Sequence, residues 1–144
     1  MGMKKVSINS VKAPKATGPF SQAILDSSTY LLELSGQVGI DPTQGKLVDG
    51  GIIPQTKQTL ANIEAVLSEV GWNFENLIKV RIFLTDMGDY QQVNELYAKK
   101  FSNQFPARIA LAVKALPLGA LIEIDCTAAG NEISKGAQEK YGIQ

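Results

Sequence analysis

The chain has 144 residues, 44% of them hydrophobic, which fits one globular domain that can bury its own core. Its net charge is zero, and it carries no basic stripe or run of like charges, so we expect neither nucleic acid nor an anionic membrane as a partner. It has no histidine and one cysteine, which excludes Ser-His-Asp and Cys-His catalysis, a histidine metal site and an internal disulfide.

The N-terminus carries charge but no long apolar stretch after it. Residues 1–6 are therefore not typical of a signal peptide. No apolar run in the chain approaches the roughly 18 residues that a membrane span needs. We expect a cytoplasmic protein.

Three short strands in succession are predicted first, over residues 5–10, 21–25 and 30–38. Alternation along the third strand divides its side chains between two faces. One face holds Tyr30, Leu32, Leu34, Gly36 and Val38, and the other holds Leu31, Glu33, Ser35 and Gln37. Because glycine inside a strand indicates a bulge or a close backbone approach, we expect one of these at Gly36.

An amphipathic helix is predicted over residues 55–70. Its apolar residues recur at helical spacing, at Leu60, Ile63, Leu67 and Val70. Pro54 lies just before this segment and Gly71 just after it, where helix starts and helix ends favour these residue types.

A fourth strand and a second helix are predicted next. The strand covers residues 77–85 and places Ile78, Val80, Ile82 and Leu84 on one face. Arg81 falls on the other face, where we expect it to be solvated or interfacial. Asp89 has Gln92 three residues on, in the spacing of a capping box, and so predicts the start of the helix. The buried stripe of this helix is Tyr90, Val93, Tyr97 and Phe101.

Asn94 lies on the inward side of this second helix, four residues after Tyr90 and three before Tyr97. A buried amide needs hydrogen-bond partners. Asn94 is therefore either a satisfied structural residue or a donor in the wall of a pocket, and the sequence favours neither.

Two strands near the C-terminus carry the charged residues that stand out. Pro106 ends the preceding helical pattern, and after it Arg108 alternates with small and apolar residues. The second strand, over residues 121–126, places Glu123 on the face opposite to Ile122, Ile124 and Cys126. If the two strands share a sheet, a guanidinium and a carboxylate can project near one pocket.

Arg108 is one of only two arginines in the chain, against twelve lysines. The guanidinium is a planar fork of donors that grips a carboxylate with two parallel hydrogen bonds. Between small and apolar neighbours, Arg108 is typical of an anion anchor. The alternative is a structural salt bridge, with Glu123 itself as a candidate partner.

The order of predicted elements implies an α+β domain, with two helices on one face of a mixed six-stranded sheet. We expect this single domain over residues 1–130 and a polar C-terminal tail, either a short helix or loose, over 131–144. The other face of the sheet includes Leu31, Phe83 and Leu121, so we infer that it buries itself against copies of the chain.

Six pieces of the chain, in this order and spacing, resemble the RidA family, also called YjgF, of enamine/imine deaminases. They are Gly18-Pro19-Phe20-Ser21-Gln22-Ala23, Ser35-Gly36-Gln37-Val38, 58–71, Val93-Asn94-Glu95-Leu96-Tyr97, Pro106-Ala107-Arg108 and Ile122-Glu123-Ile124. The resemblance covers about residues 13–129. It implies a chorismate-mutase-like fold, a homotrimer with clefts between subunits, and no metal or organic cofactor. The implied reaction is hydrolysis of small 2-enamino and 2-imino acids, such as 2-aminoacrylate and 2-iminobutanoate, to 2-keto acids and ammonia.

The resemblance also assigns roles by position. Arg108 matches the arginine that clamps the substrate carboxylate, and Glu123 matches the glutamate that holds the attacking water. Ser35 and Gly36 match residues that line the cleft, and Asn94 matches the inward asparagine of the second helix.

The chain departs from the family pattern in the cleft. Phe20 stands where the family usually has tyrosine, and Ala110 stands where it commonly has cysteine, so a hydroxyl and a thiol are absent. The family role at Ala110 can be met by its backbone carbonyl, and the tail after Gly130 exceeds the usual end. A second hypothesis is therefore a non-catalytic member of the same family that binds a small carboxylate or has a regulatory role.

Overall fold

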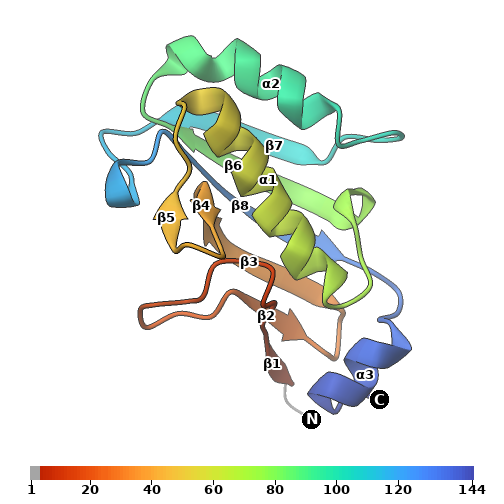
Figure 1. The fold of residues 1–144 in the computed structure, drawn as a ribbon. Coiled ribbons are helices and arrows are strands. Elements are labelled where there is room, and N and C mark those ends of the chain that lie inside the picture. The colour runs from red at the N-terminus through yellow and green to blue at the C-terminus, as the bar shows by residue number, and fades with distance from the viewer. Residues whose placement is uncertain (1–3) are drawn as a thin grey trace.

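The computed structural model describes residues 4–144; residues 1–3, part of the N-terminal segment considered above, lie outside it. A six-stranded sheet and three α-helices form an α+β fold, as predicted, with the strands in the order β1-β2-β3-β8-β6-β7 (Figure 1). The sheet strands are β1 Lys5–Ile8, β2 Ala23–Asp26, β3 Leu31–Gln37, β6 Leu77–Leu84, β7 Ala107–Ala112 and β8 Ile122–Ala129. The helices are α1 Ile52–Ser68, α2 Tyr90–Ala98 and α3 Lys135–Tyr141, and a separate two-stranded ribbon pairs β4 Ile40–Asp41 with β5 Lys46–Leu47.

The sheet is mixed because β7 runs parallel to β6, whereas the other neighbouring strands are antiparallel. A parallel pair needs a crossover connection, and α2 lies in the connection between β6 and β7. As predicted, α1 and α2 cover the same face of the sheet (Figure 1). The core lies between this face and the helices, where Leu32, Ile63, Ile82 and Ile124 are at most 1% exposed.

The first helix, α1, begins at Ile52, three residues earlier than predicted. Pro54 therefore lies inside the first turn, where its missing N–H breaks no helical hydrogen bond. Gly71, just past the helix, has φ +82°, a left-handed conformation that suits its predicted place at a helix end. None of the helices within residues 4–144 is both long and apolar enough to cross a membrane.

The third strand, β3, contains the irregularity expected at Gly36. Leu34 pairs with Cys126 but Gln37 pairs with Ile124, so three steps along β3 oppose two along β8. The alternation of side chains changes across this bulge. Gln37 is only 6% exposed and lies on the core side, so its assignment to the opposite face by simple alternation is wrong.

Two local predictions near β6 and α2 are also wrong. A register shift at the start of β6 turns Ile78 away from the core, and this side chain is 48% exposed. Asp89 precedes α2 but makes no capping hydrogen bond, so the predicted capping box is absent. Asp86 instead accepts from the Gly88 N–H and caps a 3₁₀ turn that leads directly into α2.

The C-terminal segment holds α3, which packs against the end of α1. The Ser134 side chain caps α3 by accepting from the Ala137 N–H at 3.2 Å, and the Ser134 N–H donates to the Val70 carbonyl. The apolar residues of this segment join the core cluster; they are Ile133, Ala137 and Ile143. The segment is therefore packed on the domain.

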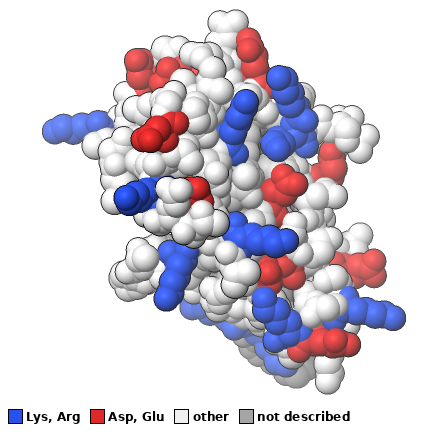
Figure 2. Space-filling view, viewed as in Figure 1, with Lys and Arg blue, Asp and Glu red and all other residues white. Residues whose placement is uncertain are grey.

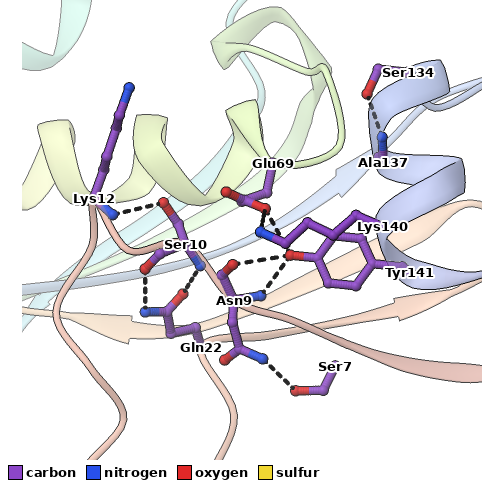
Figure 3. Close-up of polar contacts among 10 residues, drawn as sticks. All are labelled: Ser7, Asn9, Ser10, Lys12, Gln22, Glu69, Ser134, Ala137, Lys140 and Tyr141. Carbon is purple, nitrogen blue, oxygen red and sulfur yellow. Dashed lines mark hydrogen bonds and ion pairs between the residues drawn. The ribbon is translucent and has the colours of Figure 1, made fainter.

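A polar network around Glu69 joins α3, the end of α1 and the N-terminal segment (Figure 3). The Tyr141 hydroxyl donates to the Glu69 carboxylate at 2.7 Å and accepts from the Asn9 N–H at 3.1 Å. Lys140 Nζ lies 2.8 Å from the same carboxylate oxygen. Burial raises the pKa of Glu69, but the hydrogen bonds from Lys140 and Tyr141 outweigh burial and lower it overall.

We expect Tyr141→Phe to lower the free energy of unfolding by about 1 kcal/mol, because the hydroxyl bonds to a charged, mostly buried carboxylate. The melting temperature falls by about 2–5 °C at pH 7. Since the folded-state pKa of Glu69 is lowered, this contribution is present above the unfolded pKa of glutamate, about 4.3, and is lost as pH falls through the folded pKa.

The control for this thermal-melt measurement is Tyr30→Phe, whose hydroxyl makes a long hydrogen bond, 3.5 Å, with the Gln144 carbonyl. We expect Tyr30→Phe to melt close to the unmodified protein. Equal melting temperatures for the unmodified protein and Tyr141→Phe at pH 7 would show that the network does not stabilise the fold.

Candidate active site

The predicted site residues lie in two groups on opposite faces of the sheet. Strand β6 lies between β7 and β8, so the strands that carry Arg108 and Glu123 are not neighbours. Arg108 is in register with inward-facing Val80 and lies on the helix-covered face, whereas Glu123 is in register with Phe83 on the other face. The expectation that both side chains of one chain project near one pocket is therefore wrong, because strand alternation sends them to different sides.

The guanidinium of Arg108 is held by uncharged partners. Its Nη1 donates to the Asn94 amide oxygen at 2.8 Å, and its Nη2 donates to the Tyr90 hydroxyl at 2.9 Å. The rings of Tyr97 and Tyr90 lie 5.0 and 5.6 Å from its central carbon. Among residues 4–144, no carboxylate lies within ion-pair distance of Arg108, so the alternative of a salt bridge with Glu123 is wrong within one chain.

The second arginine has the contrasting environment. Arg81 forms an ion pair with Asp125 at 2.8 Å on the face that α1 and α2 leave uncovered. This hydrogen bond raises the pKa of Arg81 and satisfies its charge within the chain. Arg108 is therefore the arginine whose charge is left available to an anion.

The partners of Arg108 come from one side of α2. Tyr90, Asn94 and Tyr97 are spaced by four and then three residues, so successive helical turns bring them to Arg108. A hydrogen bond with Asn94, and then the charge of Arg108, lower the pKa of Tyr90. Burial raises the pKa of Tyr97 to about 12.

A groove of about 300 Å³ opens beside Arg108. It is lined by Asn94, Tyr97, Ala98, Phe105, Pro106 and Arg108. Asn94 is a satisfied residue, since its oxygen accepts from Arg108, and its side chain also forms part of the groove wall; its role as a donor in that wall stays a prediction. Ala110 lies two residues beyond Arg108 on the same face of β7, in register with Ile82. Strand β7 is the last of the sheet, and such an edge strand presents unpaired backbone groups.

The second group surrounds Glu123. Phe20, Ser35, Gly36 and Glu123 line a cavity of about 440 Å³. Glu123 is half-buried, and this burial, followed by the nearby charge of Asp125, raises its pKa. The Ser35 hydroxyl donates to the Ser21 carbonyl at 2.6 Å, which fixes the backbone of the bulge.

The bulge in β3 makes space for the Glu123 carboxylate. A Cβ at Gly36 would lie 2.8 Å from both Cδ and Oε2 of Glu123, which is closer than side-chain atoms approach. The close backbone approach predicted at Gly36 is therefore confirmed, and it is directed at Glu123. Ser35 and Gly36 together shape this cavity from the neighbouring strand.

Residues that the sequence did not single out complete both groups. Tyr90 and Tyr97 were expected only as buried helix residues, although their spacing with Asn94 marks a shared helix side. Leu118 lines the Glu123 cavity, is 70% exposed and has φ +60°, a left-handed conformation that is strained for leucine. Nothing in the local sequence pattern distinguishes Leu118 from an ordinary loop residue.

The site residues offer no cluster of metal-ligating side chains in the part of the chain that the structure describes. Within residues 4–144, no three or more Asp, Glu, Cys or His side chains come together in a way that could hold a metal ion. The lone thiol, Cys126, is fully buried in the core, and burial raises its pKa. The functional groups of the site, among the described residues, are a guanidinium, a carboxylate, hydroxyls, amides and backbone groups.

The chain is similar over most of its length to a family model, to a curated protein and to solved structures. The family model described as Endoribonuclease L-PSP matches residues 10–130. A protein of Homo sapiens named 2-iminobutanoate/2-iminopropanoate deaminase is 45% identical over 121 residues, covering 84% of this chain and 87% of that protein. The solved structure of YyfA from Yersinia pestis, described as a protein of unknown function of the conserved Rid protein family, is 43% identical with a TM-score of 0.85. The match covers 88% of this chain and 100% of the YyfA chain. The structure of E. coli TdcF with bound serine is 28% identical with a TM-score of 0.81, covering 87% and 98%.

We expect Gly36→Ala to move the Glu123 carboxylate while the fold stays intact. The contact made by the new Cβ is with the end of a flexible side chain, which can rotate away at low cost. A crystal structure of the variant should show Glu123 in another rotamer, and its melting temperature should stay within about 3 °C of the unmodified protein.

The matched control is Gly136→Ala in α3, where nothing lies within 4 Å of the added Cβ. This variant should leave Glu123 in place. An unmoved carboxylate in Gly36→Ala would contradict the role assigned to the bulge.

Proposed function

The chain belongs to the Endoribonuclease L-PSP family, which is the RidA or YjgF family, and from this membership we propose that it is a hydrolytic deaminase of 2-enamino and 2-imino acids. Its substrates are 2-aminoacrylate and 2-iminobutanoate, and its products are 2-keto acids and ammonia. The observation that carries the proposal is the guanidinium of Arg108, which is oriented by Asn94 and Tyr90 and lacks a carboxylate partner within residues 4–144. The 45% identity to a human protein named for this activity supports the same substrate class.

Arg108 binds the carboxylate that every 2-imino acid carries. A guanidinium has five N–H donors, and Asn94 and Tyr90 take two of them. The remaining donors can form a two-pronged hydrogen bond with the substrate. Because the side chain is already held, little rotamer freedom is lost when the substrate binds.

Glu123 acts as the general acid and base. The enamine first tautomerises to the imine, whose carbon is electrophilic. Water adds to that carbon while Glu123 takes a proton from the water, and Glu123 then returns a proton to the nitrogen. The carbinolamine expels ammonia and leaves the 2-keto acid. Such proton transfer contributes about 10²–10⁴-fold to rates, and the raised pKa of Glu123 favours it because the group can both accept and release a proton nearer neutral pH.

The complete site needs two copies of the chain. Arg108 and Glu123 lie on opposite faces of one sheet, so one substrate can touch both only if they come from different copies. A contact between two different surfaces is heterologous, and such contacts form a ring when the rotation between copies closes. Following what the family resemblance implies, the proposal includes a homotrimer with clefts between subunits and the chorismate-mutase-like arrangement of the family.

The uncovered face of the sheet supports assembly. On this face Leu31 is 37% and Ile109 is 45% exposed, and Phe83 and Leu121 are half-buried. Exposed apolar side chains on an uncovered sheet face are typical of a protein interface. We infer that neighbouring copies cover it.

The remaining predicted residues shape the cleft. Phe20 packs on the carbon chain of the substrate without donating a hydrogen bond, and Ser35 and Gly36 hold the bulge beside Glu123. Asn94 orients Arg108, and the backbone carbonyl of Ala110 accepts from the substrate nitrogen. The serine in the related TdcF structure is a small amino acid, which is consistent with a ligand of this size.

Two other functions fit less well. RNA cleavage, suggested by the description of the family model, needs a surface that attracts phosphates. The net charge is zero, and the face in Figure 2 mixes Lys and Arg with Asp and Glu.

A non-catalytic carboxylate-binding protein is favoured by the missing hydroxyl at Phe20 and the missing thiol at Ala110. Measuring ammonia release above the spontaneous rate separates this second candidate from the deaminase.

We expect Arg108→Ala to reduce turnover of 2-iminobutanoate by roughly 100-fold or more, because charged hydrogen bonds to the substrate are lost. The assay is the rate of 2-oxobutanoate formation. The fold should persist, since no ion pair of residues 4–144 involves this side chain.

Arg108→Lys is the matched variant, because it keeps the charge and removes the planar fork. It should retain only part of the activity. If Arg108→Ala turns over substrate at the unmodified rate, the anchor role is rejected.

A further inference from the structure

We propose that Tyr90 is a positioning residue of this site, whose hydroxyl holds the Arg108 guanidinium in the orientation that receives the substrate carboxylate. The inference rests on the proposed function, because it takes Arg108 as the anchor. The sequence pattern assigned Tyr90 only to the buried stripe of α2.

The contacts of Arg108 carry this inference. Its two terminal nitrogens are held by different residues, Nη1 by the Asn94 oxygen at 2.8 Å and Nη2 by the Tyr90 hydroxyl at 2.9 Å. Together with the covalent attachment of the side chain, two fixed nitrogens define the plane of the guanidinium, which one hydrogen bond does not do. Both partners are uncharged, so they orient the guanidinium and leave its charge for the ligand.

The turn before α2 fixes the backbone position of Tyr90. Tyr90 is the first residue of α2 and follows the 3₁₀ turn Met87–Asp89, which Asp86 caps through the Gly88 N–H at 2.8 Å. Asn94 lies one turn further along the same helix. The two residues that hold Arg108 therefore lie on the same helix, one turn apart.

Tyr97 does not share this role. Its ring lies 5.0 Å from the Arg108 central carbon, but its buried hydroxyl has no hydrogen-bond partner among residues 4–144. It contributes packing beneath the guanidinium. Of the two tyrosines beside Arg108, the one with a directional contact is Tyr90.

An arginine that is free to rotate loses side-chain entropy when a ligand fixes it. Holding it beforehand strengthens binding of the substrate and of the transition state alike. Loss of such uniform binding raises KM and leaves kcat nearly unchanged. A change in a purely structural residue would not produce this split at a temperature where the fold is intact.

The experiment compares Tyr90→Phe, which removes the hydroxyl and keeps the ring, with the unmodified protein. We expect the Kd for 2-oxobutanoate, measured by calorimetry, and the KM for 2-iminobutanoate to rise about fivefold, with kcat within about twofold. Tyr30→Phe is the control, since the single hydrogen bond of its hydroxyl to residues 4–144 is a long one, 3.5 Å, to the Gln144 carbonyl. It should change neither constant.

A second measurement reports directly on the rotation of the guanidinium. Nitrogen NMR of Arg108 should show faster rotation about the Cζ–Nη bonds in Tyr90→Phe than in the unmodified protein. Equal Kd, KM and rotation rates in the two proteins would overturn the inference and leave the proposed function standing. If the folded, unmodified protein neither binds 2-oxobutanoate nor releases ammonia, the anchor is rejected and the role of Tyr90 with it.

Discussion

The separation of Arg108 from Glu123 by a β-sheet is the constraint on which the rest of the structure depends. Their strands are held apart by β6, and their side chains point to opposite faces. A guanidinium and a carboxylate that met within one chain would neutralise each other. Kept apart, each remains available, and under the proposed function each is half of a site that a second copy of the chain completes.

Arg108 and Glu123 are each held by a different local arrangement. On the helix side, two neutral groups of α2 orient Arg108 and leave its charge unsatisfied, whereas Arg81 on the other face is already paired with Asp125. On the open side, the bulge at Gly36 leaves room for a half-buried carboxylate whose pKa is raised. Both arrangements lie on the sheet and α2, which suits the proposed site, because that site would have to keep its geometry across a subunit boundary.

Much of the fold could be predicted because the spacing of apolar residues and the positions of glycine and proline indicate the same elements. The α+β class, the two helices on one face and the irregularity at Gly36 follow from alternation, helical spacing and glycine. The inward direction of Gln37 and the outward direction of Ile78 could not be predicted, since each depends on a register shift set by pairing with β8. The spatial order of the strands is also invisible locally, and that order decides that Arg108 and Glu123 are not neighbours. Tyr90 was missed as a partner of Arg108 because spacing reveals a shared helix side but not which strand residue lies opposite it.

The most direct test of the central claim is a mixing experiment with Arg108→Ala and Glu123→Gln. Each variant alone should be nearly inactive toward 2-iminobutanoate. Unfolded together in equal amounts and refolded, they should recover about one quarter of the unmodified activity, because a random ring pairs an intact Arg108 with an intact Glu123 in that share of its clefts. Refolding each variant alone gives the baseline, and size-exclusion chromatography shows that the mixture reassembles. Reassembly with no activity above that baseline would contradict a site shared between two copies.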